Sequence, residues 1–176
     1  MLDWSLDVAR AATDGIVLVV PVDMAGQSEP GADVVVPGGA TRSESVRRGL
    51  TAVPADASAV LVHDAARPVP LTAVWTRVID ALRSGAEVAI PVVPIADTVR
   101  EREGTTLDRD RFVAVQTPQG FRSDVLRAAH ESGAEATDDA SLAEVIGATV
   151  TLVDGDARNI KITDPWHLAL ADILVR

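Results

Sequence analysis

The sequence contains no cysteine and only three histidines, and each shortage argues against a class of function. Without cysteine the chain has no disulfide, no thiolate zinc site and no cysteine nucleophile. Three scattered histidines argue against a histidine-based metal site. All apolar runs are of strand length and residues 1–5 lack the pattern of a secretory signal, so we expect a cytoplasmic protein with no membrane span.

Positive charge is also scarce. The chain has 16 Lys and Arg against 26 Asp and Glu, which gives a formal net charge of −10. A general nucleic-acid binder is therefore not expected, because affinity for a duplex depends on Lys and Arg that neutralise phosphates. An acidic chain can still bind an anionic small molecule where a few cations converge in one cleft.

What the chain does have is short apolar runs that alternate with helical patterns. At 176 residues, 47% of them apolar, residues 1–176 are expected to form a single domain with a substantial core. Strands are predicted at 16–20, 32–36, 59–63, 87–93, 149–153 and 159–162. Helices are predicted at 2–12, 41–50, 71–82, 123–130, 137–146 and 164–175. This order predicts an α/β fold with a Rossmann-like, mostly parallel sheet, its strands buried on both faces beneath helices.

A polar segment at 95–115 breaks this pattern. Its short alternating stretches around Gly104 predict a β-hairpin that projects from the body, in which residues 98–100 pair with 111–113. A hairpin alone in water is marginal, so we expect it to pack against a second subunit. A flexible surface loop is the alternative.

The end of the strand at 59–63 carries the first candidate site. Asp64 and Arg67 follow the apolar run, and Ala65 and Ala66 leave room for a ligand to approach the backbone. Ligands of open parallel sheets bind at such strand ends. A solvated turn with a surface ion pair is the other reading, and these residues alone leave both open.

Five motifs in order extend over almost the whole chain: PGGATRSESV at 37–46, VHDAARP at 62–68, QTPQ at 116–119, TDD at 137–139 and NIKIT at 159–163. Together they resemble the 2-C-methyl-D-erythritol 4-phosphate cytidylyltransferase family. The resemblance implies a fold of the nucleotide-diphospho-sugar transferase type and a Mg²⁺-dependent transfer of CMP from CTP to methylerythritol phosphate, with release of pyrophosphate. It also implies a homodimer whose projecting β-arms, here 95–115, exchange between subunits.

The resemblance also implies roles for single residues on the nucleotide side. Gly38, Gly39 and Ser45 would contact the cytosine, and Ala65 would lie against the nucleotide. Asp64, with Arg67 nearby, would face the sugar hydroxyls and hold the metal.

On the acceptor side, Thr98 and Arg109 of the arm would reach the partner's methylerythritol phosphate, and Thr117 would line the same pocket. Lys161 would lie between the two reacting phosphates. Thr137 is placed in the substrate pocket, although its position also suits a helix cap. Without the resemblance, Arg109 and Lys161 would be read as surface charges, and His63 as a packed residue at a strand end.

The sequence departs from the family pattern at its start, where members have a strand, a glycine-rich loop with an Arg, and a Lys after Pro. Nothing in this sequence matches that segment. We expect two apolar strand edges to be left unpaired, at residues 16–20 and 60–63, and weak or no transferase activity. A late start codon, a truncated chain and a natural loss remain open.

Two alternative functions also remain open. One is a pentitol phosphate cytidylyltransferase acting on a substrate such as ribitol 5-phosphate. The other is a non-catalytic dimeric remnant that binds a nucleotide.

Overall fold

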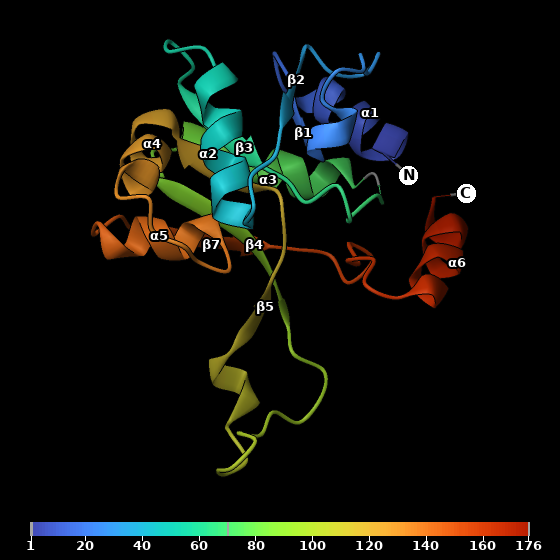
Figure 1. The fold of residues 1–176 in the computed structure, drawn as a ribbon. Coiled ribbons are helices and arrows are strands. Elements are labelled where there is room, and N and C mark those ends of the chain that lie inside the picture. Colours follow the sequence, from blue (N-terminus) through green and yellow to red (C-terminus); the bar gives the residue numbers. More distant parts are fainter. Residues whose placement is uncertain (1, 70, 176) are drawn as a thin grey trace.

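The computed structural model describes residues 2–69 and 71–175 and divides the strands between two sheets (Figure 1). The larger sheet has the order β3 (Ala59–Val62), β6 (Gln119–Arg122), β4 (Val88–Pro94) and β5 (Val113–Val115), and β7 (Val150–Asp154) also pairs with β4. The smaller sheet pairs β1 (Val17–Val20) with β2 (Val34–Pro37) in parallel.

Strand β4 is the centre of the larger sheet. It runs parallel to β7 and antiparallel to β6 and β5. Val88 and Ala89 of β4 have no exposed surface. The predicted α/β class is confirmed. Parallel pairing, predicted for most of the sheet, holds for β4–β7 and β1–β2, whereas β3–β6, β4–β6 and β4–β5 are antiparallel.

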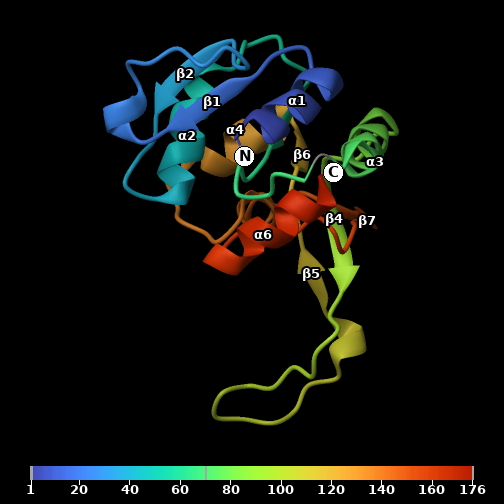
Figure 2. The ribbon, with the colours of Figure 1, turned by 90° about the vertical axis from the view of Figure 1, so that its right-hand side faces the viewer.

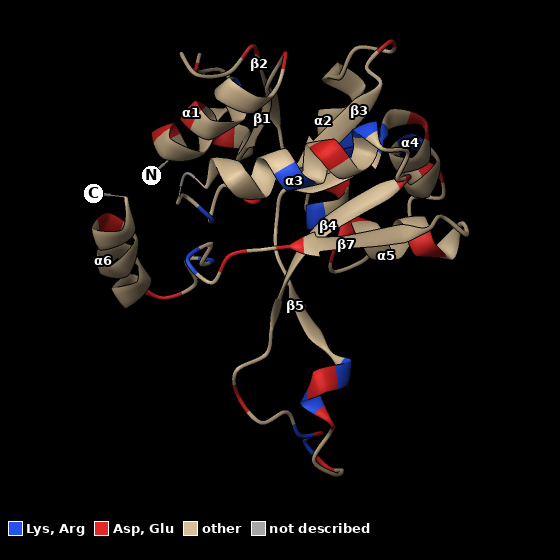
Figure 3. Cartoon of the chain, turned by 180° about the vertical axis from the view of Figure 1, so that it is seen from behind, with Lys and Arg blue, Asp and Glu red and all other residues tan. Residues whose placement is uncertain are grey.

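Helices cover both faces of this sheet, as the sequence predicts. Helix α3 (Thr72–Arg83) packs on β4, β6 and β7, and Figure 3 shows it in front of the strands. On the opposite face, α4 (Ser123–Glu131) packs on β6 and β3, and α5 (Asp139–Val145) packs on β4. The approach of α3 requires glycine at position 120, where a Cβ would lie 2.5 Å from Val78.

The main core lies between β4, β6 and the helices α2 (Arg42–Ala52), α4 and α5. Phe121 of β6 and Leu126 of α4 are fully buried within it. Burial of a side chain of this size contributes about 1.5–3 kcal/mol. This core supports β3 from one side.

The first and last helices follow their predicted ranges closely. Helix α1 spans Leu2–Ala12 and α6 spans Pro165–Leu174, with Asp164 as the N-cap of α6. Single 3-10 turns occur at Val22–Met24 and Arg109–Arg111. At the start of α2 the Thr41 hydroxyl accepts from the Glu44 amide, and the Glu44 carboxylate accepts from the Ala40 amide.

A wide gap separates the two sheets. Within the described residues, β1 pairs with β2 alone and β3 with β6 alone. A cavity of about 1540 Å³ lies between them, lined by both strands and by parts of α1, α2 and α3. The expected unpaired edges are therefore present, and β1 and β3 are half-buried where burial on both faces was predicted.

The segment at 95–112 projects far from the sheets in two perpendicular views (Figures 1 and 2). Its predicted pairing is wrong. The amide of Leu107 donates to the Val99 carbonyl at 2.8 Å, and Arg100 bridges Thr106. Residues 109–111 form a 3-10 turn instead, because the Asp108 side chain caps it through the Asp110 amide.

Residues 159–162 do not form the predicted strand. Two backbone bonds hold them, from the Asn159 amide to the Asp156 carbonyl at 2.9 Å and from the Ile162 amide to the Ala66 carbonyl at 2.8 Å. The Asn159 side chain is buried and donates to the Thr117 carbonyl at 2.9 Å, so this segment is fixed by side-chain bonds. Beyond it, α6 lies to the side of the sheets (Figure 1).

Candidate active site

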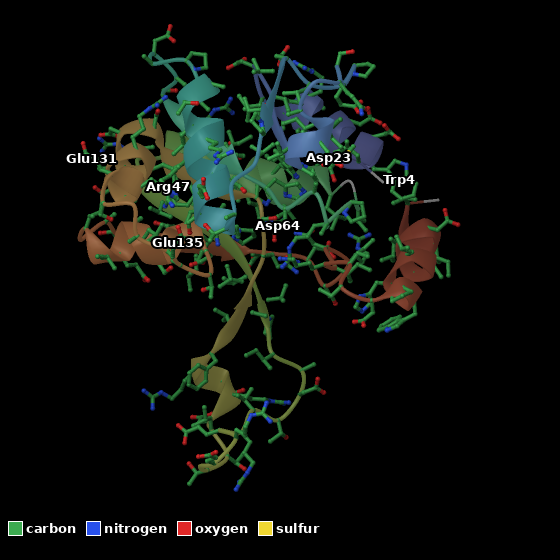
Figure 4. All side chains as sticks on the ribbon, viewed as in Figure 1. Trp4, Asp23, Arg47, Asp64, Glu131 and Glu135 are labelled. Carbon is green, nitrogen blue, oxygen red and sulfur yellow. The ribbon has the colours of Figure 1, made fainter. Side chains whose placement is uncertain are left out.

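The carboxylate of Asp64 lies between two cations at the end of β3. Its Oδ2 is 2.8 Å from Lys161 Nζ and its Oδ1 is 3.7 Å from Arg42 Nε. Figure 4 labels Asp64 beside α2, above the base of the projecting segment. Burial would raise the pKa of Asp64, but the bond and charge of Lys161, with Arg42 and Arg67, hold it below its usual value. Asp64 is therefore ionised at neutral pH.

The Thr117 hydroxyl fixes the Asp64 backbone, and His63 in turn orients that hydroxyl. The Asp64 amide donates to Thr117 Oγ1 at 3.1 Å, and Thr117 Oγ1 lies 3.0 Å from His63 Nδ1. His63 Nε2 lies 3.1 Å from the Arg67 carbonyl, which can only accept. We therefore assign the proton to Nε2, and Nδ1 accepts from the Thr117 hydroxyl. Burial lowers the pKa of His63 to about 4, which keeps the ring neutral.

Arg67 connects the loop after β3 to two distant segments. Its guanidinium donates to the Asn159 carbonyl at 2.6 Å and to the Val115 carbonyl at 3.3 Å. Burial lowers its pKa against the opposing effect of Asp64. Arg67 thus fixes the chain that carries Lys161, and Asp64 and Lys161 lie on the same side of the body, as the sequence reading requires.

Arg42 was not among the residues singled out from the sequence. Its Nη2 lies 2.7 Å from Asp139, which has no exposed surface and also bonds His130 Nε2 at 2.9 Å. Burial lowers the pKa of Arg42, but Asp139 and Asp64 outweigh this and raise it. The position of Arg42 at the start of a helix, inside the 37–46 motif, was the signal that could have identified it.

The glycine turn lies at the ends of β1 and β2. Gly38, Gly39, Ser45 and Ala65 line the same cavity as Asp64. The Ser45 hydroxyl accepts from the Gly39 amide at 3.0 Å and donates to the Thr41 carbonyl at 2.8 Å. The turn and the carboxylate therefore face one space, which suits a ligand with a base at one end and hydroxyls or phosphates at the other.

Three predicted site residues lie apart from this cluster. Thr98 and Arg109 belong to the projecting segment, where the Arg109 guanidinium contacts the Ala96 carbonyl. Thr137 is exposed, and the cap of α5 is Asp138, whose carboxylate accepts from the Ser141 amide at 3.1 Å. Asp138 fits the cap because its bond reaches three residues ahead, to the first turn of α5. Thr117, by contrast, lies within the cluster: it is 5% exposed, and its hydroxyl accepts from the Asp64 amide.

The described residues contain no cluster of three or more His, Asp or Glu side chains that could hold a metal unaided. Asp64 is a single carboxylate, and Mg²⁺ characteristically combines one or two carboxylates with phosphate oxygens and water. The site therefore fits a Mg²⁺ ion shared with a bound phosphate ligand. Among the same residues, no helix has the length and apolar character needed to cross a membrane.

Together the fold and the site define an α/β enzyme that handles a phosphorylated ligand at the ends of its strands. The comparisons with known proteins agree. The family model IspD, 2-C-methyl-D-erythritol 4-phosphate cytidylyltransferase, matches residues 1–176. The chain belongs to this family of nucleotidyltransferases.

Individual relatives are similar along most of the chain. The 2-C-methyl-D-erythritol 4-phosphate cytidylyltransferase of Streptomyces coelicolor is 43% identical, with 95% of this chain and 70% of that protein covered. The protein of the same name from Frankia casuarinae is 45% identical, over 97% of this chain and 67% of its own length. The crystal structure of the Thermus thermophilus cytidylyltransferase superposes with a TM-score of 0.88 at 40% identity, over 99% of this chain and 88% of that one.

Proposed function

We propose that this chain transfers CMP from CTP to the phosphate of 2-C-methyl-D-erythritol 4-phosphate and releases pyrophosphate, in isoprenoid precursor synthesis. The observation that carries the proposal is the Asp64 carboxylate held between Lys161 and Arg42, in the cavity that the glycine turn also lines. The similar proteins carry methylerythritol phosphate in their names, which favours this acceptor over a pentitol phosphate.

The chemistry needs positioning and neutralisation of charge more than covalent participation by the protein. Two phosphates must approach each other, and their repulsion must be cancelled. Lys161 is about half exposed, with a side-chain exposure of 46%, and its flexible amine can leave Asp64 to meet a phosphate. Asp64 then faces the sugar hydroxyls as an acceptor, while Arg42 stays fixed by Asp139.

When bound, Mg²⁺ would neutralise phosphate charge at Asp64. In this proposal the base lies at Gly38, Gly39 and Ser45, and Ala65 lies along the nucleotide. Arg67 maintains the loop geometry through its two carbonyl contacts.

Thr98 and Arg109 fit this function through a second copy of the chain. The projecting segment that carries both residues extends away from the Asp64 of its own subunit (Figure 4). Phe112 and Val113 at its base are 44% and 42% exposed, which suits an apolar contact with a partner. In the proposed homodimer the arm at 95–115 brings Arg109 to the acceptor phosphate of the neighbouring site. Thr98 and Thr117 belong to that acceptor pocket, and Thr137 to its outer side.

The proposal is tested under single-turnover conditions, with enzyme in excess over CTP. Product formation with methylerythritol phosphate is compared with that on ribitol 5-phosphate. Asp64→Asn is expected to reduce the rate about 100-fold or more. Asp80→Asn is the matched control, since Asp80 lies on the outer surface of α3 and is 61% exposed. Unchanged product formation in Asp64→Asn would contradict the proposal.

The shared site has its own test. Arg109→Ala and Asp64→Asn are each expected to be inactive, whereas a mixture of the two regains activity. In a mixed dimer one of the two sites combines an intact Asp64 with an intact Arg109. A mixture that stays inactive, although its chains have exchanged, would show that the arm serves only its own subunit.

A further inference from the structure

The backbone amides of the glycine turn are all used within the protein. The Gly38 amide donates to the Val20 carbonyl at 2.7 Å. The Gly39 amide donates to Ser45 Oγ at 3.0 Å, and the Ala40 amide to the Glu44 carboxylate at 2.7 Å. Residues 38–40 therefore offer a ligand no free amide donor.

Acceptors remain available on the same turn. Among the described residues, no hydrogen bond reaches the carbonyl of Gly39. The single hydroxyl proton of Ser45 is committed to the Thr41 carbonyl, so its remaining lone pair can only accept. Gly39 and Ser45 both line the cavity that contains Asp64. The groups that this turn presents to a ligand, the Gly39 carbonyl and the Ser45 hydroxyl, are thus hydrogen-bond acceptors and are called the acceptor edge.

The side chains of Glu44 and Arg48, one helical turn apart on α2, maintain this pattern. Arg48 Nη2 lies 2.6 Å from Glu44, and Arg48 Nη1 donates to the Gly38 carbonyl at 2.9 Å. The Glu44 side chain packs directly on Gly39, where a Cβ would lie 2.3 Å from its Cγ and Cδ. The pair holds both ends of the turn, and Glu44 occupies the one amide, that of Ala40, that would otherwise be free.

We propose that the Glu44 carboxylate, by occupying the Ala40 amide, is a positioning group that makes the site select cytosine over uracil. The inference rests on the proposed function and assigns its base preference to a residue that does not touch the base. Cytosine carries an amino group, with two N–H donors, where uracil carries a carbonyl oxygen. An acceptor edge satisfies the amino group and repels the carbonyl. A free Ala40 amide would give the uracil oxygen a donor and so weaken the discrimination.

The test is calorimetric titration of the protein with CTP and with UTP in the presence of Mg²⁺. The unaltered chain is expected to bind CTP more tightly. In Glu44→Ala the ratio of the two dissociation constants is expected to fall about tenfold, because the Ala40 amide becomes available. Glu44→Gln keeps an oxygen for that amide and is expected to restore most of the ratio.

Two further variants separate base selection from a loosened turn. Arg48→Ala uncovers another acceptor, the Gly38 carbonyl, and is expected to leave the preference for CTP in place. Arg47→Ala is the matched control, because Arg47 is on the same helix but pairs with Glu135 at 2.6 Å, and Figure 4 shows both residues away from Asp64. If Glu44→Ala and Arg48→Ala lowered the ratio equally, general loosening would explain the result and the inference would be wrong.

The remaining outcomes are also decisive. A ratio that does not change in Glu44→Ala, with CTP still bound, would overturn this inference and leave the proposed function standing. An unaltered chain that binds CTP and UTP equally would do the same. If neither nucleotide binds the unaltered chain, the proposed function itself fails, and this inference fails with it.

Discussion

Strands β4 and β1 are similar in composition but lie in different surroundings. Val88 and Ala89 of β4 are completely buried, with strands paired on both sides and helices on both faces. All four residues of β1 are half-buried, because β2 is its single partner among the described strands and a cavity lies along its other edge. Burial of an apolar run is therefore set by its neighbours more than by its residues.

The two regions differ in their ion pairs as well. Asp139, beside the larger sheet, has no exposed surface, forms an ion pair with Arg42 and is hydrogen-bonded to His130. Asp33, beside β2, is 51% exposed and pairs with Arg10 at 2.9 Å. A charge buried with its partners becomes costly when a partner is removed, whereas an exposed charge returns to water. Substitutions matched between the two regions test this contrast.

The largest effect is expected for Asp139→Ala. Its removal leaves the Arg42 guanidinium partly buried without its main partner, and we expect a loss of about 3–5 kcal/mol in the free energy of unfolding. Asp33→Ala is the matched variant and is expected to lose much less. Urea denaturation of both variants measures the difference. Equal losses would contradict the contrast between the regions.

Leucine truncation gives the next comparison. Leu126→Ala removes a fully buried side chain and is expected to cost about 2–5 kcal/mol. Leu18→Ala, in β1, truncates a half-buried side chain beside a cavity and is expected to cost about 1 kcal/mol. Thermal unfolding of the two variants under identical conditions provides the check. A cost for Leu18→Ala as large as that for Leu126→Ala would show that the smaller sheet is packed as tightly as the larger one.

A pH effect is expected at His63, where β3 ends beside the cavity. Its folded pKa of about 4 lies below the ordinary value of 6.5, so the unfolded chain binds the proton more readily. The stabilisation is complete above pH 6.5 and is lost as the pH falls toward 4. Between pH 6.5 and 5 the loss is expected to reach about 2 kcal/mol. In His63→Gln the pH dependence in this window should be flatter, and an unchanged slope would assign the effect to other groups.

The smallest effect on stability is expected for Lys161→Met. Lys161 is 46% exposed, so its pair with Asp64 contributes less than about 1 kcal/mol. The carboxyl pKa of Asp64 should rise, because the bond and charge of Lys161 hold it down. NMR titration of Asp64 measures the shift. Arg158→Ala removes an exposed cation that pairs with Asp156 and should leave the pKa of Asp64 unchanged.

The comparison also shows which features the sequence could predict. Helix α1 and the strands β4 and β7 follow from apolar periodicity and turn residues, because each is decided locally. The site at Asp64, with Lys161 on the same side, follows from the motifs at 62–68 and 159–163. Both motifs are short stretches in which residue type and position are enough to identify the site.

Other features depended on contacts between distant segments. The pairing of residues 98–100 with 105–107 was missed because residues 109–111 form a 3-10 turn capped by Asp108. The strand predicted at 111–113 therefore begins later, at Val113. The link from Arg42 to Asp139 joins residues 97 positions apart, which no local pattern encodes. Residues 159–162 likewise lie outside any strand, because the buried Asn159 side chain and isolated backbone bonds hold them in place of a strand ladder.

Arg67 has a mechanical consequence. One guanidinium grips the Val115 carbonyl, where the long arm joins the body, and the Asn159 carbonyl, two residues before Lys161. One side chain therefore ties three segments together: the base of the arm, the segment that leads to Lys161 and the loop that carries Asp64.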